Sequence, residues 1–414
     1  MLATLRWTTT PTARVLALCA TVLAVAACGP ATPPVRTGTG VTDSTITLGV
    51  LSDLTGPFGP LGKAVVEGNQ LYVDQLNAQG GVCGRKVELQ VSDSGFNTEK
   101  AAKLYFEMEP KVLGFLQVLG SDITARLQPD VVQQQVMVAP TSWSKDLLGN
   151  PYMVVVGTTY DLDVINTIDY VVRQGQLHSG DLIGHIYNDD PQYGGNALQG
   201  TQFAADRLGL TVRGVQVPSA QKDLAPQVAA LKAAGAKAVL ISTYPQQTAS
   251  AVGAAAALNY SVPVLVSAPG FDPAVLTGQL GAAFQRNVLV SSPIAPFGAD
   301  LPGAREVASA YKAKFPEGRP SMAMDYGYVV GIGYAAILRR ACAAGDLTRA
   351  GVQKAFHETT KVDTNGLSAP LMFSSSNYPS SRESFVLRPN PATPGGLDIV
   401  EGLRESELVR ARIG

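Results

Sequence analysis

The chain has 414 residues, enough for two or three domains, and its 42 glycines and 27 prolines are spread along it. Hydrophobic residues make up 46 % and charged residues 16 %, which excludes a disordered protein, a coiled coil and a collagen-like fibre. With 32 basic and 33 acidic residues the net charge is -1, so the charge balance gives no sign of a nucleic-acid partner.

The N-terminal segment predicts a signal peptide over residues 1–27. It contains Arg6 and Arg14 but no acidic residue, and its uncharged apolar run VLALCATVLAVAA is shorter than the ~20 residues that a membrane-spanning helix needs. The run ends in LAVAACG, which resembles a bacterial lipobox, so Cys28 is predicted to carry lipid and to become the N-terminus after cleavage. A plain signal peptide with an incidental cysteine is the alternative. Residues 28–44, rich in Pro, Gly and Thr, predict a lipid-anchored linker.

From Ile46 onward the hydrophobic pattern alternates between strand and helix, in two consecutive runs. This order predicts two doubly wound α/β lobes, each with a parallel sheet covered by helices on both faces. The first run has expected strands at 46–51, 87–93, 112–119 and 136–140, with helices at 63–79, 98–110 and 124–135. The second run has expected strands at 181–187, 211–217, 238–243 and 263–267, with helices at 162–174, 195–208, 224–235 and 247–258.

Ligands of open parallel sheets bind beyond the carboxyl ends of the strands, so the loops at those ends are the candidate site. These loops carry aromatic residues together with several serines and threonines, a composition typical of a small-molecule cleft. The aromatic residues are Phe58, Trp143, Tyr193, Tyr244 and Phe271.

Several segments, in this order and spacing, resemble the substrate-binding proteins of ABC importers with the type I periplasmic-binding fold, in the branched-chain amino-acid (Leu/Ile/Val) group. The segments are ITLGVLSDLTGPFGPLGKAVVEG, LNAQGGVCGRKVEL, SDSGFNTEKA, NDDPQYGGNALQG and QKDLAPQVAALKAAGAKAVLI. The resemblance implies two lobes joined by three hinge strands, which close around a ligand. The implied bounds are 45–158 and 293–366 for lobe 1, and 159–292 and 367–414 for lobe 2.

The resemblance also implies ligand contacts at particular positions. Thr124 matches the hydroxyl residue that receives the ligand's carboxylate near a helix N-terminus, and Thr141 matches a backbone contact after the fourth strand. Tyr193 and Tyr244 match two tyrosines of the second lobe. The predicted set of ligand-binding residues is completed by Ser52, Leu61, Ser142, Trp143 and Asp272.

Two positions depart from the pattern of a leucine binder. Trp143 stands where a hydroxyl should meet the ligand, and it is expected either to stack on the ligand or to belong to the core behind the loop. Pro269 stands where amino-acid binders of this group have the glutamate that pairs with the α-ammonium, and an unpaired ammonium in a closed cleft is costly. Asp272 or Asp122 is a possible substitute. Otherwise the ligand is a related carboxylate or amide without the ammonium.

Cys83 follows the first predicted helix, and Cys342 ends a helix of the same implied lobe. Because thiols outside the membrane tend to pair, a Cys83–Cys342 disulfide within lobe 1 is predicted. The pattern G-x-G-x-x-A at 331–336 lies inside a helical stretch with no strand before it, which indicates close helix packing and not a dinucleotide site. The three histidines are isolated, so no metal and no cofactor is expected.

These features together predict a solute-binding lipoprotein of an ABC importer and not an enzyme. It would be a monomer held at the extracytoplasmic face of the cell membrane through Cys28, with no nucleic-acid partner. It would deliver a small ligand, such as a branched-chain or other amino acid or a related carboxylate or amide, to a permease and its ATPase. The alternatives are a ligand-sensing lipoprotein of the same fold and a secreted α/β enzyme that uses carboxylates of the cleft loops, namely Asp53, Asp122, Asp189, Asp190 or Asp272.

Overall fold

The computed structural model describes residues 34–413, and the predicted signal peptide and Cys28 lie outside them. Residues 35–413 form one compact unit. It contains two main sheets, as the alternation of strand and helix patterns predicts; the first has the four expected strands, and the second has seven where four were expected.

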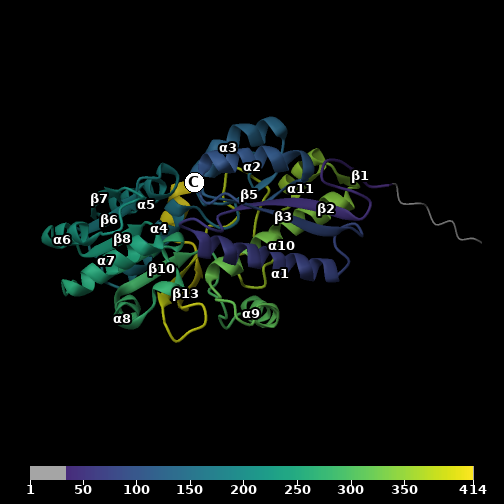
Figure 1. Ribbon diagram of the computed structural model, residues 1–414. Coiled ribbons are helices and arrows are strands. Elements are labelled where there is room, and N and C mark those ends of the chain that lie inside the picture. Colours follow the sequence, from purple (N-terminus) through teal and green to yellow (C-terminus); the bar gives the residue numbers. More distant parts are fainter. Residues whose placement is uncertain (1–33, 414) are drawn as a thin grey trace, which may run out of the picture. The chain divides into compact units, whose positions relative to one another are not determined.

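The four-stranded sheet has the order β3-β2-β4-β5, and all its strands are parallel. Figure 1 shows α2 and α3 on one side of this sheet and α1 with α10 on the other. The central strands β2 and β4 are buried on both faces, which is why they are almost continuously apolar, whereas the edge strand β3 is partly exposed. The bounds are β2 Thr45–Ser52, α1 Gly59–Ala78, β3 Lys86–Asp93, α2 Thr98–Met108, β4 Gly114–Leu119, α3 Ser121–Gln134 and β5 Val138–Thr141.

The seven-stranded sheet has the order β13-β12-β10-β9-β8-β6-β7. Strands β6 to β10 are parallel, whereas β12 and β13 add an antiparallel edge that the hydrophobic pattern did not predict. The bounds are α4 Tyr160–Arg173, β6 Leu182–Asn188, α5 Asn196–Leu208, β7 Thr211–Val217, α6 Ala225–Ala233, β8 Ala238–Ser242, α7 Pro245–Ala257, β9 Val264–Ser267, α8 Gly278–Asn287, β10 Val288–Ser292, β12 Ser384–Pro389 and β13 Leu397–Arg404.

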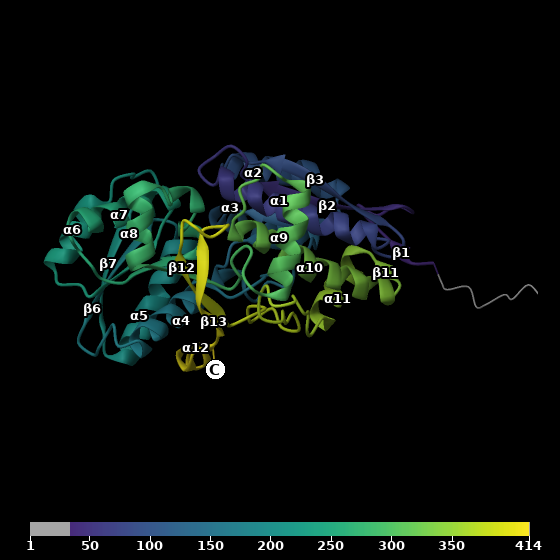
Figure 2. The ribbon, with the colours of Figure 1, turned by 90° about the horizontal axis from the view of Figure 1, so that it is seen from below.

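After β10 the chain returns to the helices of the first sheet. The long helix α10, Met322–Ala343, packs along α1 and also touches β4, and it is followed by α11, Arg349–Glu358. Helix α9, Pro302–Lys314, contacts both α1 and α10. A short parallel pair joins β1, Arg36–Thr37, to β11, Asp346–Leu347. The last helix, α12 Glu407–Ile413, lies beside α4 (Figure 2). The proposed lobe boundaries remain a prediction.

The predicted disulfide is present. Cys83 lies in the turn between α1 and β3, and Cys342 lies in the last turn of α10. Their Cα atoms are 5.8 Å apart, within the range that a disulfide spans.

Helices α1 and α10 approach so closely that their crossing requires glycines. A Cβ atom on Gly68 would lie 2.0 Å from the Met324 carbonyl oxygen, and one on Gly327 would lie 2.1 Å from the Val65 carbonyl oxygen. One on Gly331 would lie 2.6 Å from the ring of Tyr72 in α1, so this glycine of the 331–336 pattern serves helix packing, whereas Gly333 faces Leu371 and Phe373. The helices cannot keep this separation with larger side chains.

We therefore expect Gly327→Ala to lower the free energy of unfolding by about 1–3 kcal/mol, because backbone atoms must move apart to admit the methyl group. Urea unfolding measures this change. The matched control is Gly253→Ala in α7, where the nearest atom to the new Cβ is a leucine methyl carbon 3.8 Å away. That variant should gain about 0.5–1 kcal/mol from helix propensity. Equal effects of the two substitutions would contradict the assignment of close packing to Gly327.

Candidate ligand-binding pocket

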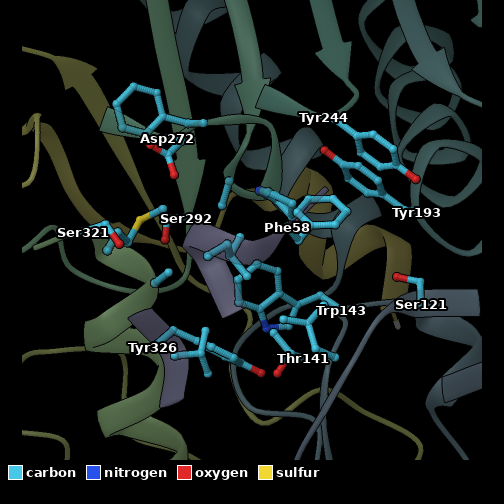
Figure 3. Close-up of a pocket in the computed structure, with 18 of the residues that line it drawn as sticks. Phe58, Ser121, Thr141, Trp143, Tyr193, Tyr244, Asp272, Ser292, Ser321 and Tyr326 are labelled. Atoms are coloured by element: carbon cyan, nitrogen blue, oxygen red, sulfur yellow. The ribbon is translucent and has the colours of Figure 1, made fainter. Parts of the chain in front are cut away.

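A pocket lies between the two main sheets, beyond the carboxyl ends of their strands. Together with its open mouth it takes up about 910 Å³. Aromatic side chains from several loops and helices form most of its wall (Figure 3). They are Phe58, Phe96, Trp143, Tyr160, Tyr193, Tyr244, Phe271 and Tyr326.

Three of these aromatic side chains donate their polar hydrogen to backbone carbonyl oxygens, and a fourth places its hydroxyl near Ser121, which itself lines the pocket. The indole Nε1 of Trp143 donates to the Val156 carbonyl oxygen at 2.6 Å, and the Tyr326 hydroxyl donates to the Pro140 carbonyl oxygen at 2.8 Å. Two further hydroxyls, those of Tyr193 and Tyr160, lie within hydrogen-bond distance of the Thr243 carbonyl oxygen at 3.3 Å and of Ser121 Oγ at 3.5 Å. Because their polar atoms are occupied, these residues offer mainly ring surface to a ligand.

Aromatic contacts connect the two sides of the pocket. The ring centroids of Phe58, at the start of α1, and Tyr244, at the start of α7, are 4.7 Å apart in an edge contact. Phe58 also packs on Phe96 at 4.9 Å, and Tyr160 packs on Tyr193 at 4.8 Å. Figure 3 shows Trp143 and Tyr326 on one side of the pocket and Tyr193 with Tyr244 on the other. A ligand in the pocket would therefore touch residues from both sheets.

The polar part of the pocket is the N-terminus of α3. Gly120 is the N-cap residue, and its φ of 118° is a conformation that favours glycine. No side chain caps this helix, and both Gly120 and Ser121 line the pocket. The first backbone N–H groups of a helix lack partners within it, and the helix dipole favours negative charge there. This end of the pocket is suited to a carboxylate or carbonyl oxygen.

The charged residues that line the pocket are both acidic. They are Asp190 and Asp272, and no Lys, Arg or His lines it within residues 34–413. Burial, together with the neighbouring carboxylate of Asp122, raises the pKa of Asp190 to about 7. Asp272 Oδ1 accepts a hydrogen bond from the Ala274 N–H at 2.7 Å. Pro269 also lies in the wall and carries no charge.

Six of the nine residues predicted to contact a ligand line the pocket, namely Leu61, Thr141, Trp143, Tyr193, Tyr244 and Asp272. The other three, Ser52, Thr124 and Ser142, are buried and bond within the protein. Ser52 Oγ donates to the Gly62 carbonyl oxygen at 3.2 Å, Thr124 Oγ1 donates to that of Gly120 at 2.7 Å, and Ser142 Oγ lies 2.8 Å from Ser121 Oγ.

The predicted start of α3 was wrong by one turn. The helix begins at Ser121 and not at Thr124. Gly120, directly after β4, is its N-cap residue, and its positive φ of 118° turns the chain from the strand into the helix. Ser121 therefore begins the first turn of the helix, the place that the resemblance assigns to Thr124. The part of α3 that lines the pocket is Ser121, next to Gly120.

Three aromatic residues of the wall were not predicted. Phe96 lies in the loop after β3. The rule that ligands bind beyond the carboxyl ends of parallel strands also selects this loop, so Phe96 could have been predicted from the sequence. Tyr160 opens α4, and Tyr326 comes from α10, about 180 positions after the loop that carries Trp143. No local pattern marks either of them. Only the packing of α10 against the first sheet brings Tyr326 to Trp143, with ring centroids 5.0 Å apart.

A sequence profile of the periplasmic binding protein family matches residues 45–391, and the chain belongs to this family. Membership in a family of binding proteins confirms the prediction that the chain is not an enzyme. Within residues 34–413 no helix is both long and apolar enough to cross a membrane.

Among curated proteins, Leu/Ile/Val-binding protein homolog 3 of Brucella melitensis is 27 % identical over 206 residues, 48 % of this chain and 54 % of that protein. The match thus spans about half the length of that relative. Leu/Ile/Val-binding protein BraC3 of Rhizobium johnstonii is 30 % identical over 104 residues, 25 % of this chain and 28 % of that protein.

Solved structures match over much more of the chain. The fatty acid ABC transporter substrate-binding protein from Thermomonospora curvata is 36 % identical, with a TM-score of 0.87 over 91 % of this chain and 96 % of that chain. A branched chain amino acid ABC transporter from Thermus thermophilus with bound valine has a TM-score of 0.77 over 90 % of this chain and 99 % of that chain. At 18 % identity, the second likeness shows the fold alone.

Proposed function

We propose that this protein is the solute-binding component of an ABC importer and that its cargo is an amphipathic carboxylic acid of the fatty-acid type. The ligand would lie between the two sheets and be released to a membrane permease driven by an ATPase. The observation that carries this proposal is the wall of aromatic rings whose polar atoms bond into the protein.

The wall favours an apolar chain over a small zwitterion. An acyl chain buries surface against Trp143, Tyr326 and their neighbours without leaving a polar group unpaired. A carboxylate at the other end of the ligand would meet the N–H groups at the start of α3 and Ser121 Oγ. The 36 % identical structure, described as a fatty acid transporter component, supports this cargo class.

A branched-chain amino acid is the second candidate. The Leu/Ile/Val-binding relatives support it, and so do the Asp190 and Asp272 carboxyl groups in the pocket, which are the groups available to an α-ammonium. Against it stand Pro269, which offers no charge, and the hydrogen bond that Asp272 already accepts from the backbone. We therefore rank the amino acid second.

A thermal-stability panel separates the two candidates. The purified protein, freed of co-purified lipid by organic extraction, is melted with saturated fatty acids of increasing chain length and with L-leucine and L-valine. A ligand at 100 times its Kd stabilises the folded protein by about 2.7 kcal/mol, so the fatty acids should raise the melting temperature and the amino acids should not. A shift with leucine or valine alone would establish the second candidate, and no shift with any compound would contradict both.

For the location of the protein we propose a lipid anchor at Cys28, on the extracytoplasmic face of the cell membrane. The support is in the sequence, namely the apolar run followed by small residues and the cysteine. The part of the predicted linker 28–44 that precedes β1 would then act as the tether between the lipid and the folded unit, because Arg36–Thr37 already pairs with β11. A ligand-sensing role in place of transport would use the same pocket, and loss of cellular uptake of the identified ligand on gene deletion is the result expected for transport.

A further inference from the structure

Two carboxyl groups from opposite sides of the pocket meet at its mouth. Asp122 lies in the first turn of α3, which covers the four-stranded sheet, and Asp190 lies in the loop after β6 of the seven-stranded sheet. The two carboxyl groups lie close enough that the charge of Asp122 acts on Asp190. Both line a second cavity that adjoins the main pocket, and Asp190 lines the main pocket as well.

The loop that carries Asp190 is held against the first sheet by direct contacts. Ser144 Oγ donates to Gln192 Oε1 at 2.8 Å, and the Lys145 N–H donates to Asn196 Oδ1 at 3.2 Å. Asp190 Oδ1 itself accepts from the Gln192 N–H at 2.7 Å, which fixes the carboxyl group in place. The two carboxyl groups are therefore neighbours only while these parts of the molecule touch.

The other titratable groups facing the pair offer no positive charge. Asp189 adds a third carboxylate, but its Oδ1 is occupied by the N–H and hydroxyl of Ser219 at 3.0 and 2.5 Å. The remaining groups are the hydroxyls of Tyr160, Tyr193 and Tyr244. In the described part of the chain no Lys, Arg or His lines either cavity.

Two cations on adjoining segments have their own partners, and Lys222, in the loop after Ala220, is exposed and does not line either cavity. Arg126, one turn further along α3, pairs with Asp130 at 3.0 Å, and Lys145 pairs with Asp146 at 2.9 Å. His185 of β6 is buried between Ser242 and Thr201, with its ring nitrogens 3.1 and 2.9 Å from their hydroxyl oxygens. Two ionised carboxylates at the mouth would thus repel each other without compensation, whereas one shared proton turns the repulsion into a hydrogen bond.

We propose that closure of the two halves of the protein around the pocket is coupled to the uptake of one proton by the Asp122–Asp190 pair. The protonated pair holds the mouth shut, and the doubly ionised pair drives it apart. The coupling requires no particular ligand, so its test is independent of the proposed cargo class.

The direction of the pH dependence follows from the environment of Asp190. In the closed form burial and Asp122 raise its pKa to about 7, and in the open, solvated form the pKa should return toward the ordinary value of 3.8. A raised pKa means that the closed form binds the proton more tightly. The contribution of the pair to closure is therefore complete below about pH 4 and is lost as the pH rises through about 7.

The test is small-angle X-ray scattering of the ligand-free full protein from pH 5.5 to 8.5. We expect the radius of gyration of the wild type to increase with pH, with a midpoint near pH 7. Asp190→Asn and Asp122→Asn remove the mutual repulsion and should keep one radius of gyration throughout. Asp189→Asn, at the same mouth but outside the pair, is the matched control and should behave like the wild type.

Either of two results would overturn the proposal. One is a wild-type radius of gyration that does not change over this pH range. The other is a wild-type pH dependence that persists in both Asp190→Asn and Asp122→Asn. Because no ligand is added, neither result depends on whether the panel compounds bind.

Discussion

Replacement of both Cys83 and Cys342 by serine is expected to lower the free energy of unfolding by about 2–5 kcal/mol. The bond closes a loop between residues that are 259 positions apart, so the oxidised unfolded chain has far less conformational freedom than the open one. In the folded protein the bond joins the turn after α1 to the end of α10, and these helices already pack along each other. Urea unfolding of the double variant and the wild type gives the difference.

Reduction of the wild type provides the matched control for this prediction. With a thiol reductant present, the wild type should unfold at the same urea concentration as the double variant, and the reductant should leave the variant unchanged. The loss should appear mainly as a lower midpoint, although a more expanded unfolded chain also raises the dependence on urea. A double variant as stable as the oxidised wild type would show that helix packing alone holds this end of the fold.

Most parallel strands could be predicted, because the central ones are buried on two faces and read as short apolar runs between helical patterns. The edge strands β3 and β7 are partly exposed, and β10 was not predicted. β4 and β8 are buried at every position, and their short apolar sequences indicate buried strands. β13 is different, because its exposure alternates along LDIVEGLR and only its first residue is buried. Its pairing with β12 joins residues near the C-terminus to a sheet built mostly from 182–292, and no local pattern encodes that partner.

The candidate site could be located but not completed from the sequence. The rule that ligands bind at the carboxyl ends of strands selects the loops of Trp143, Tyr193 and Tyr244, and all three residues line the pocket. The rule cannot select Tyr326, because this residue comes from a helix that returns to the first sheet late in the chain. It also cannot tell Ser121 from Thr124, because the φ of Gly120 decides where α3 begins.

Trp143 was expected either to stack on the ligand or to belong to the core, and the structure gives it features of both. Its side chain is only 8 % exposed and its Nε1 bonds to a backbone oxygen, as expected of a core residue, yet its ring lines the pocket between Tyr160 and Tyr326. Both roles make a difference when the side chain is removed. A change in ligand affinity reports the pocket role, and a change in unfolding free energy reports the core role.

We expect Trp143→Ala to weaken binding of the panel compound with the largest thermal shift by about 10- to 100-fold, because a buried aromatic contact of this kind is worth about 1.4–2.8 kcal/mol. The same variant should lose about 3–5 kcal/mol of stability through the cavity it leaves. Isothermal titration calorimetry well below the melting temperature of the variant separates the two effects, since only folded protein is then titrated.

Trp143→Phe is the control that keeps a ring in the wall and removes the Nε1–H that reaches the Val156 carbonyl oxygen. Leaving that buried oxygen without its donor should cost about 1–3 kcal/mol of stability, whereas affinity should fall by less than in Trp143→Ala because the apolar surface largely remains. If Trp143 acts only as a core residue, both variants will be destabilised and both will bind with wild-type affinity. That outcome would assign ligand contact to the other rings of the wall and leave the indole as their support.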